Sequence, residues 1–140
     1  MAVNHKIMRP LFAIGVGLFV AYSSYQWITN TERAARRTHE ETVVQESRRV
    51  LLAYVADGSE IEISDALDRV RAAGKVYIYP TADGWEISGH YRRGDDSRWH
   101  SFLMTLDEDT RLLSLSVGDD DRDLQQKAAT DPLFLVSTND

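Results

Sequence analysis

Apolar positions follow two different patterns along the chain, a long unbroken run near the N-terminus and short alternating runs further on. Between Leu11 and Ile28 the sequence has no Asp, Glu, Lys or Arg, although these residues make up 27% of the chain. A helix that crosses a bilayer needs about 20 mostly apolar residues, and aromatic residues such as those at the end of this run favour the membrane interface. We therefore expect residues 10–28 to form a single transmembrane helix after a tail at residues 1–9.

Two other interpretations of the apolar run stay open. A cleaved secretory signal would have a shorter apolar run before a small-residue cleavage site, and Val20-Ala21-Tyr22 fits such a site poorly. A buried helix of a soluble protein is the second alternative. The length of the run favours the membrane anchor.

One face of the expected transmembrane helix carries small residues. Ala13, Gly17 and Ala21 recur at intervals of four and would let a second helix pack closely against this one. The alternative is that Gly and Ala are simply common in membrane helices. Because no ionisable residue lies in the middle of the span, a proton relay is not expected.

The charges that flank the span set its expected orientation. Lys6 and Arg9 precede it, and Arg33, Arg36 and Arg37 follow it, so the positive-inside rule is nearly balanced. A short tail with two positive charges usually stays in the cytoplasm. We therefore expect a cytoplasmic N-terminus and a soluble domain that is periplasmic or otherwise extracytoplasmic.

Residues 29–58 are expected to form a helical stalk that continues into a docking helix. Thr29 and Glu32 have the spacing of a capping box, which would restart a helix just beyond the membrane. The first half of the segment is polar, whereas the second half repeats at spacings of three and four. The stripe that would dock on the soluble domain consists of Val43, Val44, Ser47, Val50, Leu51, Tyr54 and Val55.

Residues 59–118 are expected to hold one helix and a sheet. Ser64 as N-cap and Gly74 as C-cap predict the helix. Four alternating runs follow, KVYIYP, GWEISGHYRR, RWHSFLMTL and RLLSLSV, with the turn-rich segments TADG, GDDS and DEDT between them. They predict a four-stranded antiparallel meander packed on helices, and so an α+β fold.

The short turns between the runs fix a testable register for the meander. In the first hairpin, Ile78 would pair with Ile87 and Val76 with Gly89. The second and third hairpins would form the pairs Trp85–Leu106, Ile87–Met104, Gly89–Phe102, Met104–Leu113, Phe102–Leu115 and His100–Val117. The Phe102 ring would then cover the bare backbone at Gly89.

The last segment, residues 119–140, is expected to be a short helix and a C-terminal tail. Asp119 to Asp121 would cap that helix. The apolar residues after Pro132, which include Leu133 and Phe134, need cover. They would lie on the open sheet face, add a strand at its edge, or dock on a partner by strand addition.

The sheet face turned away from the helices holds the main binding candidates. Tyr77, Tyr79, Arg92 and Trp99 are of types enriched at protein interfaces. The register places Arg92 opposite Trp99, within reach for stacking of the guanidinium on the ring. With Leu133 and Phe134 of the tail, these four form the predicted partner-binding set. The alternative is an ordinary strand face filled with good strand formers.

Charge and composition narrow the classes of partner. After residue 30 the chain has 14 Lys and Arg against 22 Asp and Glu, a balance of −8. Such an acidic domain repels nucleic acid, because binding there depends on neutralising phosphates. The chain has no cysteine, which excludes disulfides and thiolate chemistry.

No motif of a catalytic or metal site stands out. The register puts His90 and His100 on opposite faces, so they do not converge on a metal. Asp119, Asp121 and Asp123 have calcium-loop spacing, but the loop lacks its required glycine and its final glutamate. GxSxG, HExxH, P-loop and GxGxxG motifs are missing. We expect no enzyme activity, cofactor or metal.

The arrangement of a membrane helix, its helical extension and a four-strand meander resembles that of type IV pilins and pseudopilins. The resemblance covers most of the chain and concerns layout only. Those families carry a small residue and Phe at a processing site before the apolar run, with Glu at the fifth position beyond. The corresponding HKIMRPLFAIGVG has no such Glu.

Together these patterns predict a single-pass, non-enzymatic accessory or structural subunit of a larger membrane protein complex. It would contact the lipid bilayer and other subunits, and its helix face would also allow a homo-oligomer. The alternative is a free-standing extracytoplasmic binding or sensor module, or a pseudopilin-like assembly element.

Overall fold

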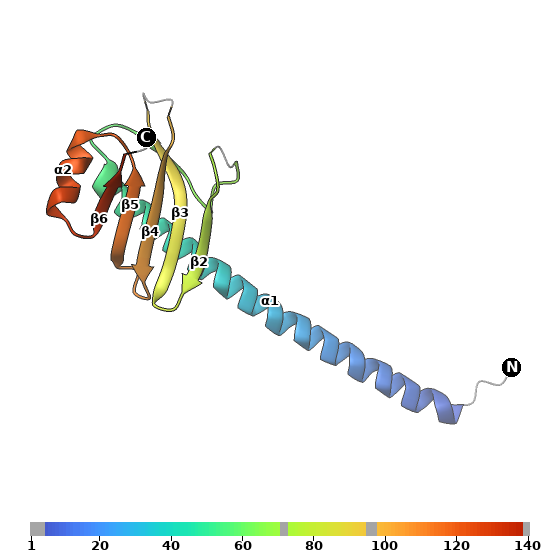
Figure 1. Ribbon diagram of the computed structural model, residues 1–140. Helices are drawn as coiled ribbons and strands as arrows, with labels where there is room; N and C mark the ends of the chain where they lie inside the picture. The colour runs from blue at the N-terminus through green and yellow to red at the C-terminus, as the bar shows by residue number, and fades with distance from the viewer. Residues whose placement is uncertain (1–4, 71–72, 95–97, 139–140) are drawn as a thin grey trace. The chain divides into compact units, whose positions relative to one another are not determined.

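A computed structural model describes residues 5–70, 73–94 and 98–138 of the chain. The chain divides into two units, Met1–His39 and Glu40–Asp140. Figure 1 shows one long helix, α1 (His5–Val55), and a sheet with a second helix. The fold is therefore α+β.

Helix α1 runs without interruption through the position where a new helix was expected to start. Thr29 does not cap a helix, because its hydroxyl donates to the carbonyl oxygen of Tyr25 (2.9 Å) one turn earlier. By length and composition α1 is apolar enough to cross a membrane, and no residue of its most apolar window is buried. The first unit thus consists of one apolar helical segment followed by a polar one.

Within the described residues, the sheet of the second unit has six strands, not the expected four. They are β1 (Ile61–Ser64), β2 (Tyr77–Thr81), β3 (Gly84–Arg93), β4 (His100–Asp107), β5 (Leu112–Gly118) and β6 (Phe134–Ser137). The spatial order is β1-β3-β4-β5-β6, with β2 also paired to β3. Because β6 is parallel to β5, the sheet is mixed, and the purely antiparallel meander was wrong.

Strand β1 ends at Ser64, where a helix was expected to begin. Ile61 and Ile63 alternate with polar residues, and Ile63 pairs with Tyr91 of β3. The chain then turns at Asp65, whose buried carboxylate accepts hydrogen bonds from the backbone N–H of Leu67 (3.0 Å) and from Arg48 of α1 (2.6 and 2.7 Å). The described residues between Asp65 and Gly74 contain no helix, so a tertiary ion pair overrides the local helical signal.

The register of the first two hairpins largely confirms the prediction. Ile78 pairs with Ile87, although Val76 precedes β2 and does not pair with Gly89. Trp85–Leu106, Ile87–Met104 and Gly89–Phe102 all form as expected. A Cβ at position 89 would lie 2.8 Å from the Phe102 ring, so that ring does cover the glycine backbone.

The third hairpin differs from the prediction by two residues. Leu115 pairs with Met104 and Val117 with Phe102. The register shifts between Thr105 and Leu106, which is a β-bulge that inserts one extra residue. Leu113 is that extra residue and is exposed, so its expected place on the apolar face was wrong.

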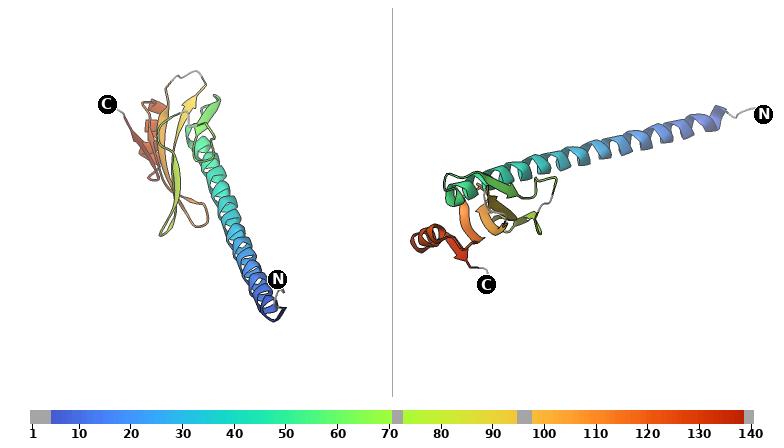
Figure 2. Two further views of the ribbon diagram at one scale, coloured as in Figure 1. Left: turned by 90° about the vertical axis from the view of Figure 1, so that its right-hand side faces the viewer. Right: turned by 90° about the horizontal axis from the view of Figure 1, so that it is seen from above.

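Residues 40–55 of α1 cover one face of the sheet (Figure 2). Val43, Leu51 and Val55 pack there with the inward side chains of β3, β4 and β5. These helix residues belong to the predicted docking stripe, so the stripe is confirmed. Burial of such apolar surface stabilises the unit by roughly 25 cal/mol per Å².

Helix α2 (Arg122–Thr130) connects β5 to β6. Asp121 is its N-cap and accepts a hydrogen bond from the backbone N–H of Asp123 (2.8 Å), as the sequence predicted. Leu124 and Phe134 anchor α2 and β6 in the core. The apolar tail residues therefore add a strand to the chain's own sheet.

Candidate interaction surface

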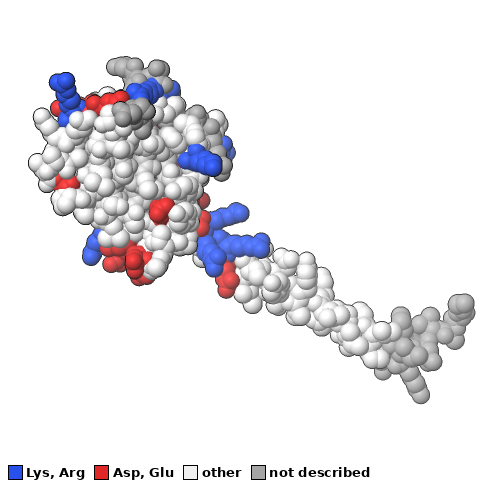
Figure 3. Space-filling view, in the orientation of Figure 1, with Lys and Arg blue, Asp and Glu red and all other residues white. Residues whose placement is uncertain are grey.

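The sheet face opposite α1, here called the outer face, has no helix packed on it among the described residues (Figure 2). One row of paired residues crosses it from β2 to β6, namely Tyr77, Ser88, Leu103, Ser116 and Leu135. Within that row Tyr77 is 36%, Leu103 41% and Leu135 59% exposed. Figure 3 shows this face largely free of charged side chains, which gather around its margins.

Two tyrosines and a carboxylate form a cluster at the β2 side of the outer face. The Tyr77 and Tyr79 rings are stacked, with centroids 5.1 Å apart and planes 19° apart. Both hydroxyls donate to the same oxygen of Glu86 on β3. The bond to Glu86 raises the pKa of Tyr79 to about 12, because a proton shared with a carboxylate is harder to remove. We call this group the tyrosine–glutamate cluster.

A second group on the outer face contains an arginine. The guanidinium carbon of Arg92 lies 4.9 Å from the centre of the Trp99 ring, as the register predicted. Arg92 also pairs with Glu62 of β1, with its Nη2 atom 2.6 Å from the carboxylate. Arginine, aromatic ring and carboxylate therefore meet here, and we call this group the Arg92 cluster.

The remaining predicted partner-binding residues, both in the tail, lie in different environments. Leu133 is exposed, whereas Phe134 is buried and its ring centroid is 5.0 Å from that of Tyr54. Phe134 therefore serves the core, while Leu135, which the prediction left out, is the exposed apolar residue of β6. Strand alternation in FLVS was the signal that could have separated them.

The small residues of the expected membrane helix share an exposed face. Ala13, Gly17 and Ala21 are all exposed, and a Cβ at Gly17 would touch nothing within 4 Å. Residues four apart lie one above another on a helix. The face is thus flat and uncovered within the described part of the chain.

A buried ionic network, which the sequence did not predict, lies beneath the sheet. The Asp119 carboxylate accepts hydrogen bonds from the Tyr91 hydroxyl (2.6 Å) and from Nη1 of Arg93 (2.9 Å). Burial alone would raise the pKa of Asp119, but these two bonds overcome it and lower that pKa. His100 is also close, with Nδ1 3.7 Å from the carboxylate and 3.1 Å from the carbonyl oxygen of Gly118.

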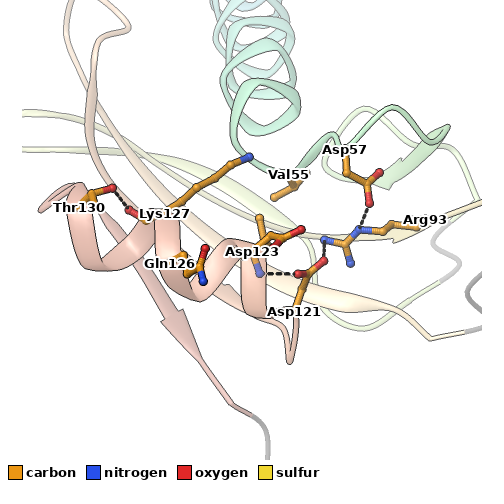
Figure 4. A pocket seen from close by; sticks show the side chains of 9 residues that line it. Val55, Asp57, Arg93, Asp121, Asp123, Gln126, Lys127 and Thr130 are labelled. Carbon is orange, nitrogen blue, oxygen red and sulfur yellow. Dashed lines mark hydrogen bonds and ion pairs between the residues drawn. The ribbon is translucent and has the colours of Figure 1, made fainter.

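A pocket of about 430 Å³ opens beside this network, between the end of α1 and helix α2. Figure 4 shows the Arg93 guanidinium between the carboxylates of Asp57 and Asp121, at 3.7 and 3.6 Å. Lys127, which also lines it, donates to the last turn of α1 at the Tyr54 carbonyl oxygen (3.1 Å). Arg93 and Lys127 thus contact other groups of the protein around the pocket, and the Lys127 contact joins α2 to the end of α1.

His90 and His100 lie on neighbouring strands of the sheet. His90 pairs with Ser101 and Tyr91 with His100, which places the two histidines on opposite sheet faces, as predicted. Burial lowers the pKa of His90 and so favours its neutral form. Within residues 5–70, 73–94 and 98–138, no group of three or more His, Asp or Glu could hold a metal ion.

Comparison with models of protein families, with curated proteins and with solved structures gave no match for this chain. Any function must therefore be argued from the geometry of the two units themselves.

Proposed function

We propose that this protein is a single-pass membrane-anchored, non-enzymatic accessory subunit of a larger membrane protein complex. The observation that carries the proposal is the charge-free run of α1, whose side chains are exposed along its whole length. Monomeric soluble proteins rarely leave such large apolar patches in water. The hydrocarbon core of a bilayer would remove those apolar side chains from water, and the run has the length that a bilayer requires.

The soluble unit supplies binding surface in this proposal. Its outer face is partly apolar and aromatic, and no helix among the described residues packs on it. In the described ranges, its two buried carboxylates are each paired with an arginine, Asp65 with Arg48 and Asp119 with Arg93. These features favour a partner-binding role over a catalytic one. Contacts within the membrane would use the face of Ala13, Gly17 and Ala21.

The orientation that we propose keeps the N-terminus in the cytoplasm and the soluble unit on the periplasmic or extracytoplasmic side. The chain has no cysteine, so a single Ser59→Cys substitution gives a unique label site on an exposed loop. A membrane-impermeant maleimide should label intact cells bearing this variant. Labelling only after lysis would show the opposite orientation, with the soluble unit in the cytoplasm.

The subunit proposal is tested by purification of the tagged full chain from its native membranes in gentle detergent. We expect one or more other membrane proteins to co-purify in fixed ratio. A protein that elutes alone as a monomer would contradict the proposal. Cross-linking in membranes separates the alternatives, because links to other proteins support a subunit whereas links between copies support a self-assembling element.

A further inference from the structure

The outer face carries two groups that combine aromatic rings with a carboxylate, and only one of them contains a cation. In the Arg92 cluster the guanidinium stacks on Trp99 and pairs with Glu62. In the tyrosine–glutamate cluster, stacked rings and the Glu86 carboxylate are both present. Across the described ranges no Lys or Arg forms an ion pair with Glu86, whose partners are the two tyrosine hydroxyls.

We infer that the tyrosine–glutamate cluster binds an arginine side chain presented by a partner protein. The inference rests on the proposed accessory-subunit function and specifies the chemistry of the partner. The arginine would complete the cluster as Arg92 completes its own, with its guanidinium bonded to Glu86 and stacked on the exposed ring of Tyr79, which is 45% exposed. Its binding involves no covalent step.

Charge complementarity selects a cation for this position. Glu86 lies two residues along β3 from Gly84, which pairs with Asp107. At that end of the sheet Asp83, Glu108 and Asp109 lie with Asp107 around one hollow. Like charges close together disfavour any anion, and the faces of aromatic rings attract cations.

Arginine fits the cluster better than lysine does. Its planar guanidinium donates in a fork that matches a carboxylate and also stacks on rings, whereas an ammonium is a strongly hydrated point charge. The cluster is already ordered, since both tyrosine hydroxyls hold the Glu86 carboxylate. Ordering before binding reduces the entropy that association costs.

Apolar residues should lie on one side of that arginine in the partner. Leu103 follows Tyr77 by two strands in the same row, and Leu135 follows Leu103 by two more. Neighbouring strands lie about 4.8 Å apart, so these side chains succeed one another every ~10 Å. A partner surface with apolar side chains about 10 and 20 Å from its arginine, in the direction of β6, matches this spacing of exposed groups.

The test uses the full chain in lipid nanodiscs and the peptide Ac-Leu-Arg-Leu-amide as the probe. A matched peptide carries citrulline, which has the shape of arginine without its charge. We expect NMR shifts at Tyr77, Tyr79 and Glu86 with the arginine peptide, and at least about fivefold weaker binding of the citrulline peptide, because charge-assisted hydrogen bonds exceed neutral ones. No binding, or equal binding of the two peptides, would overturn the inference.

Variants locate the binding on the chain. Glu86→Gln should weaken the arginine peptide at least about fivefold, and Tyr79→Leu should also weaken it by removing the ring. Glu108→Gln is the matched control, since Glu108 is an exposed carboxylate of the neighbouring turn without stacked rings. Thermal unfolding of each variant checks that the unit stays folded. Equal losses in Glu86→Gln and Glu108→Gln would show general attraction to an acidic surface and would refute the site.

Failure of this inference can be told apart from failure of the subunit proposal. If Glu86→Gln leaves the co-purified complex intact, the complex forms through another surface, and the arginine site is wrong while the subunit proposal stands. If the wild-type chain elutes alone, the subunit proposal fails whatever the peptides show.

Discussion

Arg92 and Arg93 are neighbours on β3, and the structure uses them in opposite ways. Arg92 lies on the outer face, where its guanidinium stacks on Trp99 and pairs with the exposed Glu62. Arg93 points the other way, and its side chain is only 14% exposed beside Asp119. Strand alternation alone separates them, so one residue type serves an accessible surface and a buried network one position apart.

The difference shows that burial decides what a charge contributes. An exposed ion pair is screened by water and typically contributes about 1 kcal/mol or less to the free energy of unfolding. A buried charge that loses its partner leaves the other charge uncompensated, which is far more costly. We therefore expect the inner arginine to matter for folding and the outer one for association.

Loss of the inner arginine should give the largest effect. In Arg93→Ala the Asp119 carboxylate would stay buried without its arginine partner, and the Tyr91 hydroxyl and the backbone N–H of Asp121 would remain as its hydrogen-bond donors. We expect the free energy of unfolding to fall by about 3–5 kcal/mol. Chemical denaturation of the full chain in detergent, followed by near-UV circular dichroism, measures this. Arg92→Ala is the matched control, and equal losses in the two variants would remove the contrast between the faces.

The second largest effect should be a loss of stability of the inner network in acid. The folded-state pKa of Asp119 is lowered from its ordinary value of 3.8, so its stabilisation is present above that value and is lost as the pH falls through the lower folded-state pKa. The stability difference between wild type and Asp119→Asn should therefore be constant from pH 7 to about 5 and shrink in stronger acid. Denaturation at a series of pH values tests this, and a difference that does not change with pH would contradict it.

The residues of the outer face could be predicted from the sequence because their positions follow from short-range patterns. Alternation and short turns fixed the pairs around Ile87, and they placed Arg92 beside Trp99. The apolar repeat identified the docking stripe of α1. Each of these signals connects residues that are either close in sequence or joined by one tight turn.

The inner network could not be predicted from the sequence, because the residues that form it are far apart along the chain. Arg93 and Asp119 are 26 positions apart, and no local pattern marks them as a pair. The Arg48–Asp65 pair similarly turned an expected helix at Ser64 into a strand end. Strand β6 needed the crossover through α2, and the register of β5 moved by one residue at its turn and by one more at the bulge of Leu113. Tertiary contacts settled all four features.

Loss of the outer arginine should affect association more than folding. In Arg92→Ala or Trp99→Ala we expect a melting temperature close to that of wild type, since the pair is exposed and contributes about 1 kcal/mol at most. Recovery of the co-purified partners should decrease, because Arg and Trp are types that dominate interfaces. Quantitative co-purification and thermal unfolding are measured on the same preparations. If both variants unfold, the outer face is part of the core and does not bind partners.

The smallest effect should be a titration shift on the outer face. The chain has six tyrosines, and the hydrogen bond to Glu86 raises the pKa of Tyr79 to about 12. Glu86→Gln should bring that pKa down towards the ordinary value of 10.0. Ultraviolet titration of wild type, Glu86→Gln and Tyr79→Phe measures this pKa. The absorbance change that is missing in Tyr79→Phe belongs to the Tyr79 hydroxyl.

The sign of the Tyr79 shift also predicts how alkali acts on the cluster. Since the folded-state pKa is raised, the hydrogen bond to Glu86 contributes fully below pH 10 and is lost as the pH rises towards 12. Near pH 12 the Glu86 carboxylate is therefore less ordered, and the arginine peptide should bind it less tightly. The guanidinium of the peptide stays charged over this pH range. If Tyr79 titrates at its ordinary pKa in wild type, its hydroxyl does not hold Glu86. The exposed carboxylate would then resemble any other surface glutamate, and the preference for arginine would lose its structural basis.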